Sequence, residues 1–360
     1  MNITNTVKKI NKRLLPNNYL FSPEWIILGV NNVCNLHCKM CDVGTNNTET
    51  VFAQNLVGTH PLNMPLDLIK KVIDQMALYF PKAKLGYAFT EPLVYPFLEE
   101  SLKYASDRNI RTSITTNALT LKQKAKTIVD GKLNDLFISL DGPEDIHNEI
   151  RGHKKSFQKA IDGIEEVLRL NPNQKISVFC VITEWNIGYL KEFTDYFKKY
   201  PLVNLGLMHT NFTSQQIANE HNLKWGNLYT ATASNVDEIN IDNYNFNLLW
   251  EEIKNIKKEK YPFNVSFSPE IISKEKLIEF YKVPEKKIGK GCNDVFTSIM
   301  IKSDGSVIPS HGRCYNLNLG NIYNNSLEEI WKGITLSKFR KDLNNNGGLL
   351  PACSRCCSAF

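Results

Sequence analysis

The chain has 360 residues, of which 42% are hydrophobic and 22% charged, and its formal net charge is +6. This composition is typical of a globular protein with a sizeable core and excludes a disordered chain. The positive charge is modest and no RNA-binding or DNA-binding motif accompanies it, so we expect no nucleic-acid partner. Since the sequence has neither a signal peptide nor a run of about 18 apolar residues, we expect a cytoplasmic protein without stable membrane insertion.

Residues 1–21 predict a short basic helix that leads into the main domain. Four basic side chains alternate there with three apolar ones at helical spacing, namely Lys8, Lys9, Lys12 and Arg13 with Val7, Ile10 and Leu14. We expect this helix to pack on the protein with its basic face in solvent. A helix lying on a membrane surface is the alternative.

The most informative motif follows a short apolar strand predicted at residues 25–30. Cys34, Cys38 and Cys41 occupy the loop that leaves this strand. Their asymmetric spacing lets three thiolates converge on one small object and differs from the paired C-x-x-C of a zinc ribbon. Three thiolates hold three irons of a [4Fe–4S] cube and leave the fourth iron open. Buried structural cysteines, or a zinc site completed by His37, are the alternatives.

Predicted helices and strands alternate from residue 64 to residue 208. The helices are expected at 64–80, 95–108, 121–130, 157–170 and 189–200, and the strands at 83–89, 110–115, 135–140, 175–182 and 203–208. Together with the first strand, these make six strands that alternate with helices, which predicts a parallel α/β sheet with right-handed crossovers. Functional residues of such sheets lie at the carboxyl ends of the strands.

The cysteine spacing and its position after the first strand resemble the signature of the radical S-adenosylmethionine superfamily. The resemblance implies a partial (β/α)6 TIM-like barrel over residues 22–210. It also implies a [4Fe–4S] cluster whose open iron binds S-adenosylmethionine, cleavage of that molecule to a 5′-deoxyadenosyl radical, and removal of a substrate hydrogen atom. An electron donor such as flavodoxin or ferredoxin is the implied protein partner.

Short motifs after the next three strands strengthen the resemblance because they follow in the family's order. Residues 90–92, Thr-Glu-Pro, resemble the Gly-Glu-Pro segment that holds the methionyl ammonium, and residues 115–117 resemble the Thr-Asn-Gly segment near the ribose. Residues 139–143 and 147–152 resemble the Ser-Leu-Asp-Gly and Ile-Arg-Gly stretches. The resemblance thus implies that S-adenosylmethionine contacts Met40, Thr90, Glu91, Asn117, Ser139, Asp141 and Arg151.

Three of these residues have specific expected roles. Arg151 is expected to bind a carboxylate through charge-assisted hydrogen bonds, and Ser139 to bond the ribose or the carboxylate. Met40 fits a position beside the adenine, with core packing as the alternative. Two catalytic candidates lie outside the motifs. Cys180, in the fifth strand, is either a buried small side chain or a hydrogen-atom donor, and His209, at the end of the sixth, is either structural or a general base.

Residues 288–360 contain a second group of cysteines, which comprises Cys292, Cys314, Cys353, Cys356 and Cys357. A predicted hairpin at 296–309 and a helix capped at Ser326 accompany them, and together they resemble the C-terminal SPASM or Twitch auxiliary-cluster extension of the family. Because three residues follow Cys357, we predict the shorter Twitch-like form with a single fully ligated cluster. The predicted ligands of this auxiliary [4Fe–4S] cluster are Cys292, Cys314, Cys353 and Cys356.

The ligand set of this extension leaves alternatives open. Cys357 is the alternative to Cys356 as the fourth ligand, and a zinc ribbon is the alternative to the cluster. The family's usual second ligand stands five residues after the hairpin glycine, where this chain has Ser310.

Residues 211–287 match no motif and are expected to form a substrate-covering insertion with a peripheral helix at 246–260. A fully ligated second cluster does not bind substrate, so we expect it to exchange electrons. The predicted reaction is oxidation of a hydroxyl of a small molecule, namely a sugar, a sugar nucleotide or an aminocyclitol. The alternatives are a radical epimerase or dehydratase, a peptide-modifying maturase, which the short segment before the first strand disfavours, and a non-enzymatic iron–sulfur redox sensor or scaffold.

Overall fold

The computed structural model describes residues 3–360, with side chains from residue 6 onward. One ten-stranded sheet forms its centre, in the order β10-β9-β8-β1-β2-β3-β4-β5-β6-β7. Seven strands run parallel in chain order: β1 (Trp25–Leu28), β2 (Lys84–Tyr87), β3 (Thr112–Thr116), β4 (Asp135–Ser139), β5 (Lys175–Ile182), β6 (Asn204–His209) and β7 (Asn264–Ser268). The predicted α/β class and parallel barrel are confirmed.

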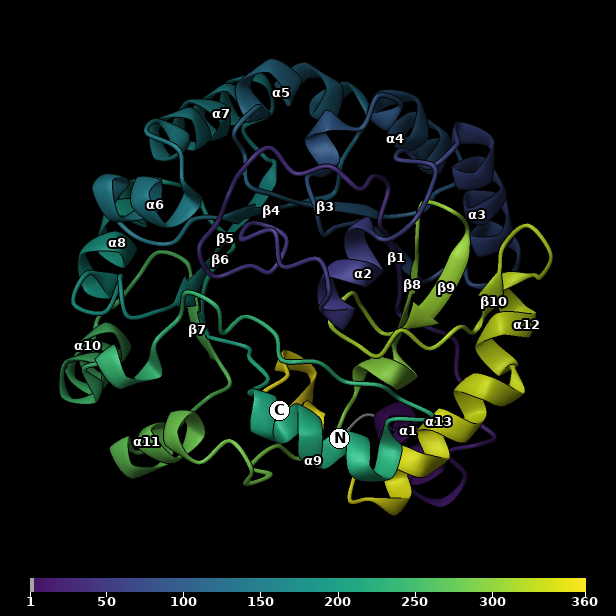
Figure 1. The fold of residues 1–360 in the computed structure, drawn as a ribbon. Coiled ribbons are helices and arrows are strands. Elements are labelled where there is room, and N and C mark those ends of the chain that lie inside the picture. The colour runs from purple at the N-terminus through teal and green to yellow at the C-terminus, as the bar shows by residue number, and fades with distance from the viewer. Residues whose placement is uncertain (1–2) are drawn as a thin grey trace.

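Helices cover the outer face of the curved sheet and form an arc around it (Figure 1). They are α3 (Leu66–Tyr79), α4 (Leu98–Asp107), α5 (Leu121–Asp130), α6 (Glu144–Arg151), α7 (Ser156–Leu170) and α8 (Leu190–Tyr196). Most of them bury an apolar stripe, as Ile69, Val72 and Met76 of α3 illustrate with no exposed surface, whereas α6 buries His147, Ile150 and Arg151. Within the described chain, no helix combines the length and the hydropathy needed to span a bilayer.

The segment 211–287 contains three helices and the seventh strand. The helices are α9 (Gln215–Trp225), α10 (Phe246–Lys258) and α11 (Lys274–Lys282). The sequence analysis predicted α10 but missed β7, which pairs with β6. Its sequence, NVSFS, alternates the apolar Val265 and Phe267 with polar residues, so a short strand signal was present and the sequence analysis overlooked it.

The C-terminal hairpin extends the same sheet. Its first strand, β8 (Ser298–Ile301), pairs in parallel with β1 over the register Trp25↔Ser298 to Leu28↔Ile301. The hairpin then returns through β9 (Ser306–Pro309) to β10 (Gly320–Asn321), as predicted for β8 and β9. The parallel contact with β1 joins this region to the barrel through a continuous hydrogen-bonded ladder.

Two helices follow where the sequence predicted one. The predicted capping box between Ser326 and Glu329 is present at the start of α12 (Leu327–Lys332). Gly333, in an extended conformation with ψ of 152°, then interrupts the helix before α13 (Ile334–Asn345). Glycine favours such a break because it is a poor helix former.

The N-terminal helix α1 (Ile3–Leu14) packs differently from the predicted orientation. Lys8 pairs with Glu24 at 2.9 Å, and the Lys12 ammonium lies 4.9 Å from the centre of the Phe296 ring. These two lysines therefore face the protein, because their aliphatic stems and charges contact carboxylate and aromatic partners. Three apolar side chains of the helix are exposed instead, namely Val7, Ile10 and Leu14.

Candidate functional site

Three thiols of the loop after β1 line one cavity of about 330 Å³ at the carboxyl ends of the strands. Cys34, Cys38 and Cys41 form one part of its wall. The segments that follow β2, β3 and β4 supply another part, and five predicted cofactor-binding residues are among the lining side chains: Met40, Thr90, Asn117, Ser139 and Arg151. The sequence therefore located this cavity at the correct edge of the sheet.

The cluster loop is held in place by the end of α6. Lys39 N–H donates to the Ile150 carbonyl at 2.9 Å. Gly152 then takes a left-handed conformation with φ of 65°, and a Cβ at this position would lie 2.9 Å from the His37 carbonyl oxygen. Glycine is needed here for both reasons, because another side chain would be strained and would push the helix end away from the cysteines.

Arg151 places a positive charge beside the thiols. Its Nη1 lies 3.7 Å from Cys38 Sγ, and its Nε donates to Asp141 Oδ2 at 2.5 Å. Burial lowers the pKa of Arg151, but Asp141 and Cys38 raise it, and the net result is above the ordinary value. The other oxygen of Asp141 accepts from Val181 N–H at 2.9 Å, so Asp141 does not line the cavity but orients Arg151 from behind.

Glu91 also acts from behind the cavity wall. Its carboxylate is completely buried and accepts from Thr116 Oγ1 at 2.7 Å, Asn117 N–H at 2.8 Å and Leu93 N–H at 2.9 Å. Burial raises the pKa of Glu91, and these hydrogen bonds act in the opposite direction. The sequence analysis expected Glu91 to contact the methionyl ammonium, whereas in the structure its carboxylate fixes the segment after β3 and is absent from the lining.

Thr90 occupies a backbone conformation that favours glycine, the residue the family has at this position. Its φ is 35°, and the preceding Phe89 has φ of 64°. The Thr90 hydroxyl donates to the Asn31 carbonyl at 2.9 Å and to Asn31 Oδ1 at 2.7 Å. These hydrogen bonds stabilise the turn although the residue is not glycine. Thr90 therefore still lies on the cavity wall.

The thiols suit a metal cluster by their chemistry. Burial raises the pKa of Cys34, and raises that of Cys38 to about 12. Burial disfavours the free thiolates, and a bound metal would displace the protons because its positive charge stabilises the thiolates. Arg151 near Cys38 and Asn117 Nδ2, 4.0 Å from Cys34 Sγ, supply the N–H donors that support cluster sulfurs. The residues present therefore fit an iron–sulfur cluster with three cysteine ligands.

Asp42, directly after Cys41, connects the cluster loop to the segment that precedes α10. Its Oδ2 accepts from the hydroxyls of Thr50 at 3.0 Å and Ser234 at 2.7 Å, and its Oδ1 accepts from Asn235 N–H at 2.7 Å. The side chain is buried. No local pattern in the sequence signals this role, because the contacts join residues far apart in the chain.

Neither catalytic candidate lies on a described cavity wall. Cys180 is fully buried, its Sγ lies 3.7 Å from Asn186 Nδ2, and burial raises its pKa well above the ordinary value. His209 is covered by α11, where its Nδ1 bonds the Tyr281 hydroxyl at 2.9 Å, and burial lowers its pKa to about 3. This packing does not support the expected roles of Cys180 as hydrogen-atom donor and of His209 as general base. The position of His209 at a strand end did not reveal that α11 covers it.

A second, smaller cavity, of about 70 Å³, brings the C-terminal cysteines together. Cys292, Cys314, Cys353 and Cys356 all line it. Burial raises the pKa of Cys292 and Cys314, and raises that of Cys353 to about 11. The Tyr315 hydroxyl lies 3.2 Å from Cys353 Sγ. Four converging sulfur donors fit a fully ligated cluster.

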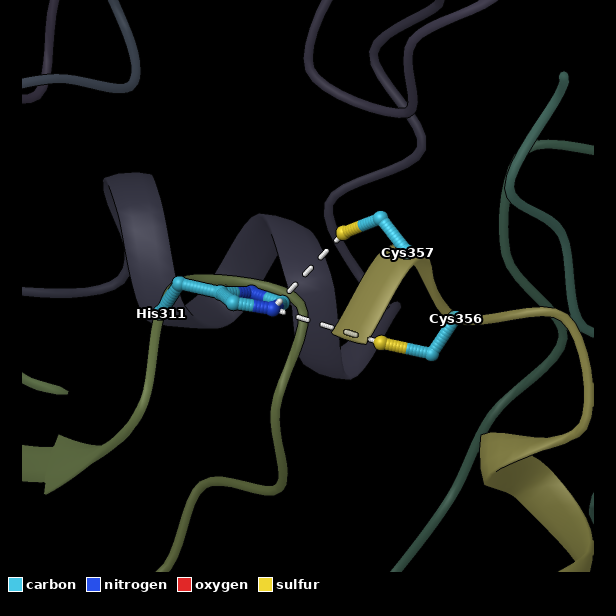
Figure 2. Close-up of side chains that lie close together, drawn as sticks. All are labelled: His311, Cys356 and Cys357. Carbon is cyan, nitrogen blue, oxygen red and sulfur yellow. Dashed lines mark hydrogen bonds between the residues drawn. The ribbon is translucent and has the colours of Figure 1, made fainter. Parts of the chain in front are cut away.

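Cys357 lies outside this set. It is exposed and is absent from the cavity lining, although its Sγ lies 3.9 Å from His311 Nε2, which also approaches Cys356 Sγ at 4.0 Å. Figure 2 shows both thiols pointing toward the same end of the imidazole, where the two dashed lines meet. His311, Cys356 and Cys357 thus form one group of possible metal ligands, of which Cys356 also lines the cavity with the other three cysteines.

The short helix α2 (Val51–Val57) lies between the two cavities, on the inner side of the arc (Figure 1). Phe52 lines both cavities, and the Arg313 guanidinium lies 4.3 Å from the centre of its ring. Asn55 Nδ2 donates to the carbonyls of Gly312 at 2.9 Å and Cys314 at 2.8 Å. The sequence analysis missed this helix and its contacts. The only local signal is Thr50, whose side chain caps it.

Comparison with known proteins agrees with this arrangement. Residues 29–197 match the radical SAM superfamily, and residues 292–357 match SPASM, an iron–sulfur cluster-binding domain. GTP 3′,8-cyclase of Helicobacter pylori strain J99 is 25% identical over 156 residues, which cover 43% of this chain and 46% of that protein. The serine-type anaerobic sulfatase-maturating enzyme of Bacteroides thetaiotaomicron is 27% identical over 182 residues, or 47% of this chain and 42% of that protein. The chain thus matches somewhat less than half of the length of these relatives.

Solved structures show the same fold over most of the chain. SuiB of Streptococcus suis, bound to the precursor peptide SuiA, has a TM-score of 0.62 and 16% identity, and covers 93% of this chain and 70% of its own. The protein anSMEcpe with bound AdoMet has a TM-score of 0.58 and 18% identity. The match covers 88% of this chain and 82% of the anSMEcpe chain. The chain belongs to the radical SAM superfamily and carries a C-terminal SPASM iron–sulfur cluster-binding domain.

Proposed function

We propose that this protein uses S-adenosylmethionine to oxidise a carbon that bears a hydroxyl group in its substrate. The observation that carries the proposal is the cavity in which three cysteines meet Thr90, Asn117, Ser139 and Arg151. When bound there, the cluster supplies the electron that splits S-adenosylmethionine into methionine and a 5′-deoxyadenosyl radical, which then takes a hydrogen atom from the substrate.

The residues around the cavity have distinct proposed roles. Cys34, Cys38 and Cys41 hold the cluster. Arg151, oriented by Asp141, binds the carboxylate of S-adenosylmethionine and offsets the negative charge of the thiolates. The polar groups of Thr90, Asn117 and Ser139 bind its remaining polar atoms, Met40 packs beside the adenine, and Glu91 keeps Asn117 in position.

The second cavity supports an oxidation. Cys292, Cys314, Cys353 and Cys356 are proposed to hold an auxiliary cluster with no free iron. After hydrogen abstraction from a carbon that bears a hydroxyl, the substrate still has to lose one proton and one electron to become a carbonyl. A cluster held by these four cysteines would accept that electron, so the substrate would be oxidised by two electrons in all. Phe52 and α2 separate the two sites and hold them in a fixed arrangement.

The comparisons favour a peptide as the substrate. One relative is named a serine-type sulfatase-maturating enzyme, and a structure with the same fold is bound to a precursor peptide. A serine or threonine side chain has the required carbon with a hydroxyl. A sugar or aminocyclitol has the same group and is the second candidate, because the predicted electron-accepting role of the auxiliary cluster applies equally to it.

Anaerobic incubation of the reconstituted and reduced protein with S-adenosylmethionine tests the proposal. We expect 5′-deoxyadenosine from the wild type and none above background from a variant with Cys34, Cys38 and Cys41 replaced by alanine. The absence of 5′-deoxyadenosine from the wild type would overturn the proposal and leave an iron–sulfur sensor or scaffold.

The substrate class is tested by the same incubation with serine-containing peptides, sugar nucleotides and aminocyclitols that carry deuterium beside the hydroxyl. Oxidation transfers deuterium into 5′-deoxyadenosine and leaves a product that lacks two hydrogens. Gain of solvent deuterium without that mass loss would instead indicate an epimerase, and loss of water would indicate a dehydratase.

A further inference from the structure

Ser310 stands where related auxiliary domains have a cysteine, and its surroundings are unusual. It follows β9, is 1% exposed and lines the cavity with the four thiols. Its Oγ has no hydrogen-bond partner among the side chains and backbone that the structure describes. The hydroxyl is therefore buried in a sulfur-rich cavity with nothing to bond.

The backbone of Ser310 is held in a conformation that serine seldom adopts. Its φ is 62°, in the left-handed region, and its N–H donates to the Ser298 carbonyl at 3.2 Å. An unpaired buried hydroxyl and a left-handed non-glycine residue both cost free energy. Their coincidence at one cavity-lining position indicates that the hydroxyl has a partner when the cavity is filled.

Cysteine sulfur is one type of acceptor that lines the cavity. Four cysteine sulfurs line it, and the Tyr315 hydroxyl already contacts one of them, Cys353 Sγ, at 3.2 Å. The other two cavity-lining serines already donate to carboxylates, Ser234 to Asp42 Oδ2 at 2.7 Å and Ser358 to Asp294 Oδ2 at 2.6 Å. Ser310 is thus the cavity-lining serine that has a free donor to offer.

We infer that the Ser310 hydroxyl donates a hydrogen bond to a sulfur of the auxiliary cluster and makes that cluster a better electron acceptor. The inference rests on the auxiliary cluster of the proposed function. Hydrogen bonds to cluster sulfurs withdraw negative charge and raise the reduction potential. Ser310 is a positioning residue in this scheme and not an iron ligand, because the four thiols complete the ligand set.

Redox titration of the reconstituted holoprotein, followed by electron paramagnetic resonance, tests the inference. S-adenosylmethionine is added so that only the signal of the cluster with an open iron changes, which identifies the auxiliary signal. The variants are Ser310→Ala, which removes the hydroxyl, and Ser310→Gly, which also relieves the backbone. Ser306→Ala is the matched control, because Ser306 lies in the same hairpin outside the cavity and its hydroxyl bonds Asp304 at 2.6 Å.

We expect both Ser310 variants to keep the iron content of the wild type and to shift the auxiliary midpoint potential to lower values, while Ser306→Ala matches the wild type. An unchanged potential in Ser310→Ala, or loss of about half of the iron, would overturn the inference and leave the proposed function intact. A wild-type chain with about four irons, or with zinc in the second site, would overturn both the inference and the proposed auxiliary cluster.

Discussion

Removing the Asp42 carboxylate is expected to loosen the segment that precedes α10. In Asp42→Ala, the N–H of Asn235 and the hydroxyl of Ser234 lose their acceptor inside the protein. Thr50 is less affected, because its hydroxyl also lies 3.4 Å from the Asn47 carbonyl. An unsatisfied buried donor costs about 1–3 kcal/mol, so two of them lower the local opening free energy by about 3 kcal/mol.

Asp237→Ala is a matched control for this prediction. Asp237 also connects the cluster loop to this segment, since it accepts from Asn47 Nδ2 at 2.7 Å and from the Thr45 hydroxyl at 3.4 Å. It is exposed, and water replaces its hydrogen bonds, so its loss is expected to cost no more than about 0.5 kcal/mol.

Amide hydrogen exchange, read by mass spectrometry on the anaerobic holoprotein, measures the difference. A change of about 3 kcal/mol corresponds to roughly 100-fold faster exchange for residues 213–235 in Asp42→Ala, against about two-fold in Asp237→Ala. Asp42→Asn keeps one acceptor oxygen and is expected to fall between them. Equal exchange in the two alanine variants would refute the reasoning, because burial would then make no difference to these hydrogen bonds.

Three further predictions concern the cysteines, the buried ion pair and a buried histidine. Cys353→Ala is expected to lower the iron content from about eight to about four per chain, whereas Cys357→Ala leaves it unchanged; a loss in the second variant would reassign the ligand. Arg151→Met leaves Asp141 buried without its cation, which costs about 3–5 kcal/mol of folding stability. Calorimetry is expected to show lost S-adenosylmethionine binding and a lower unfolding midpoint temperature. Wild-type values of both would contradict this prediction. Burial lowers the pKa of His209 from 6.5 to about 3. As the pH falls below 6.5, this histidine therefore takes up a proton in the unfolded chain but not in the folded one. Its contribution to the free energy of unfolding is fully present above pH 6.5 and is lost as the pH falls toward 3. The wild type is expected to lose about 1.4 kcal/mol between pH 7.5 and 5.5, and His209→Gln should lose less in anaerobic unfolding; parallel curves would argue against this histidine.

The sequence predicted the sheet and the first cavity because their signals are local. Apolar runs marked β1 to β6, and the cysteine spacing and the strand-end motifs placed five lining residues correctly. Each of these patterns lies within about ten residues of chain, so one sequence is enough to read it.

The remaining features depend on contacts between distant segments. Glu91 turned inward because Thr116 and Asn117 supply its donors, and His209 was covered by α11. The Asp42 carboxylate accepts from the Ser234 hydroxyl, and the Asn55 side chain donates to a carbonyl of the loop after β9. Periodicity and motif order carry no information on such pairings, which require the fold.

The parallel ladder between β1 and β8 has a consequence for electron transfer. The loop that carries the first three cysteines leaves β1, and the loops that carry Cys292 and Cys314 flank the hairpin that starts with β8. The strand pair that joins these loops is therefore held by backbone hydrogen bonds over four residue pairs, without a hinge at this contact. Electron exchange between the sites is expected to occur across a constant gap, and its rate is expected to be insensitive to solvent viscosity.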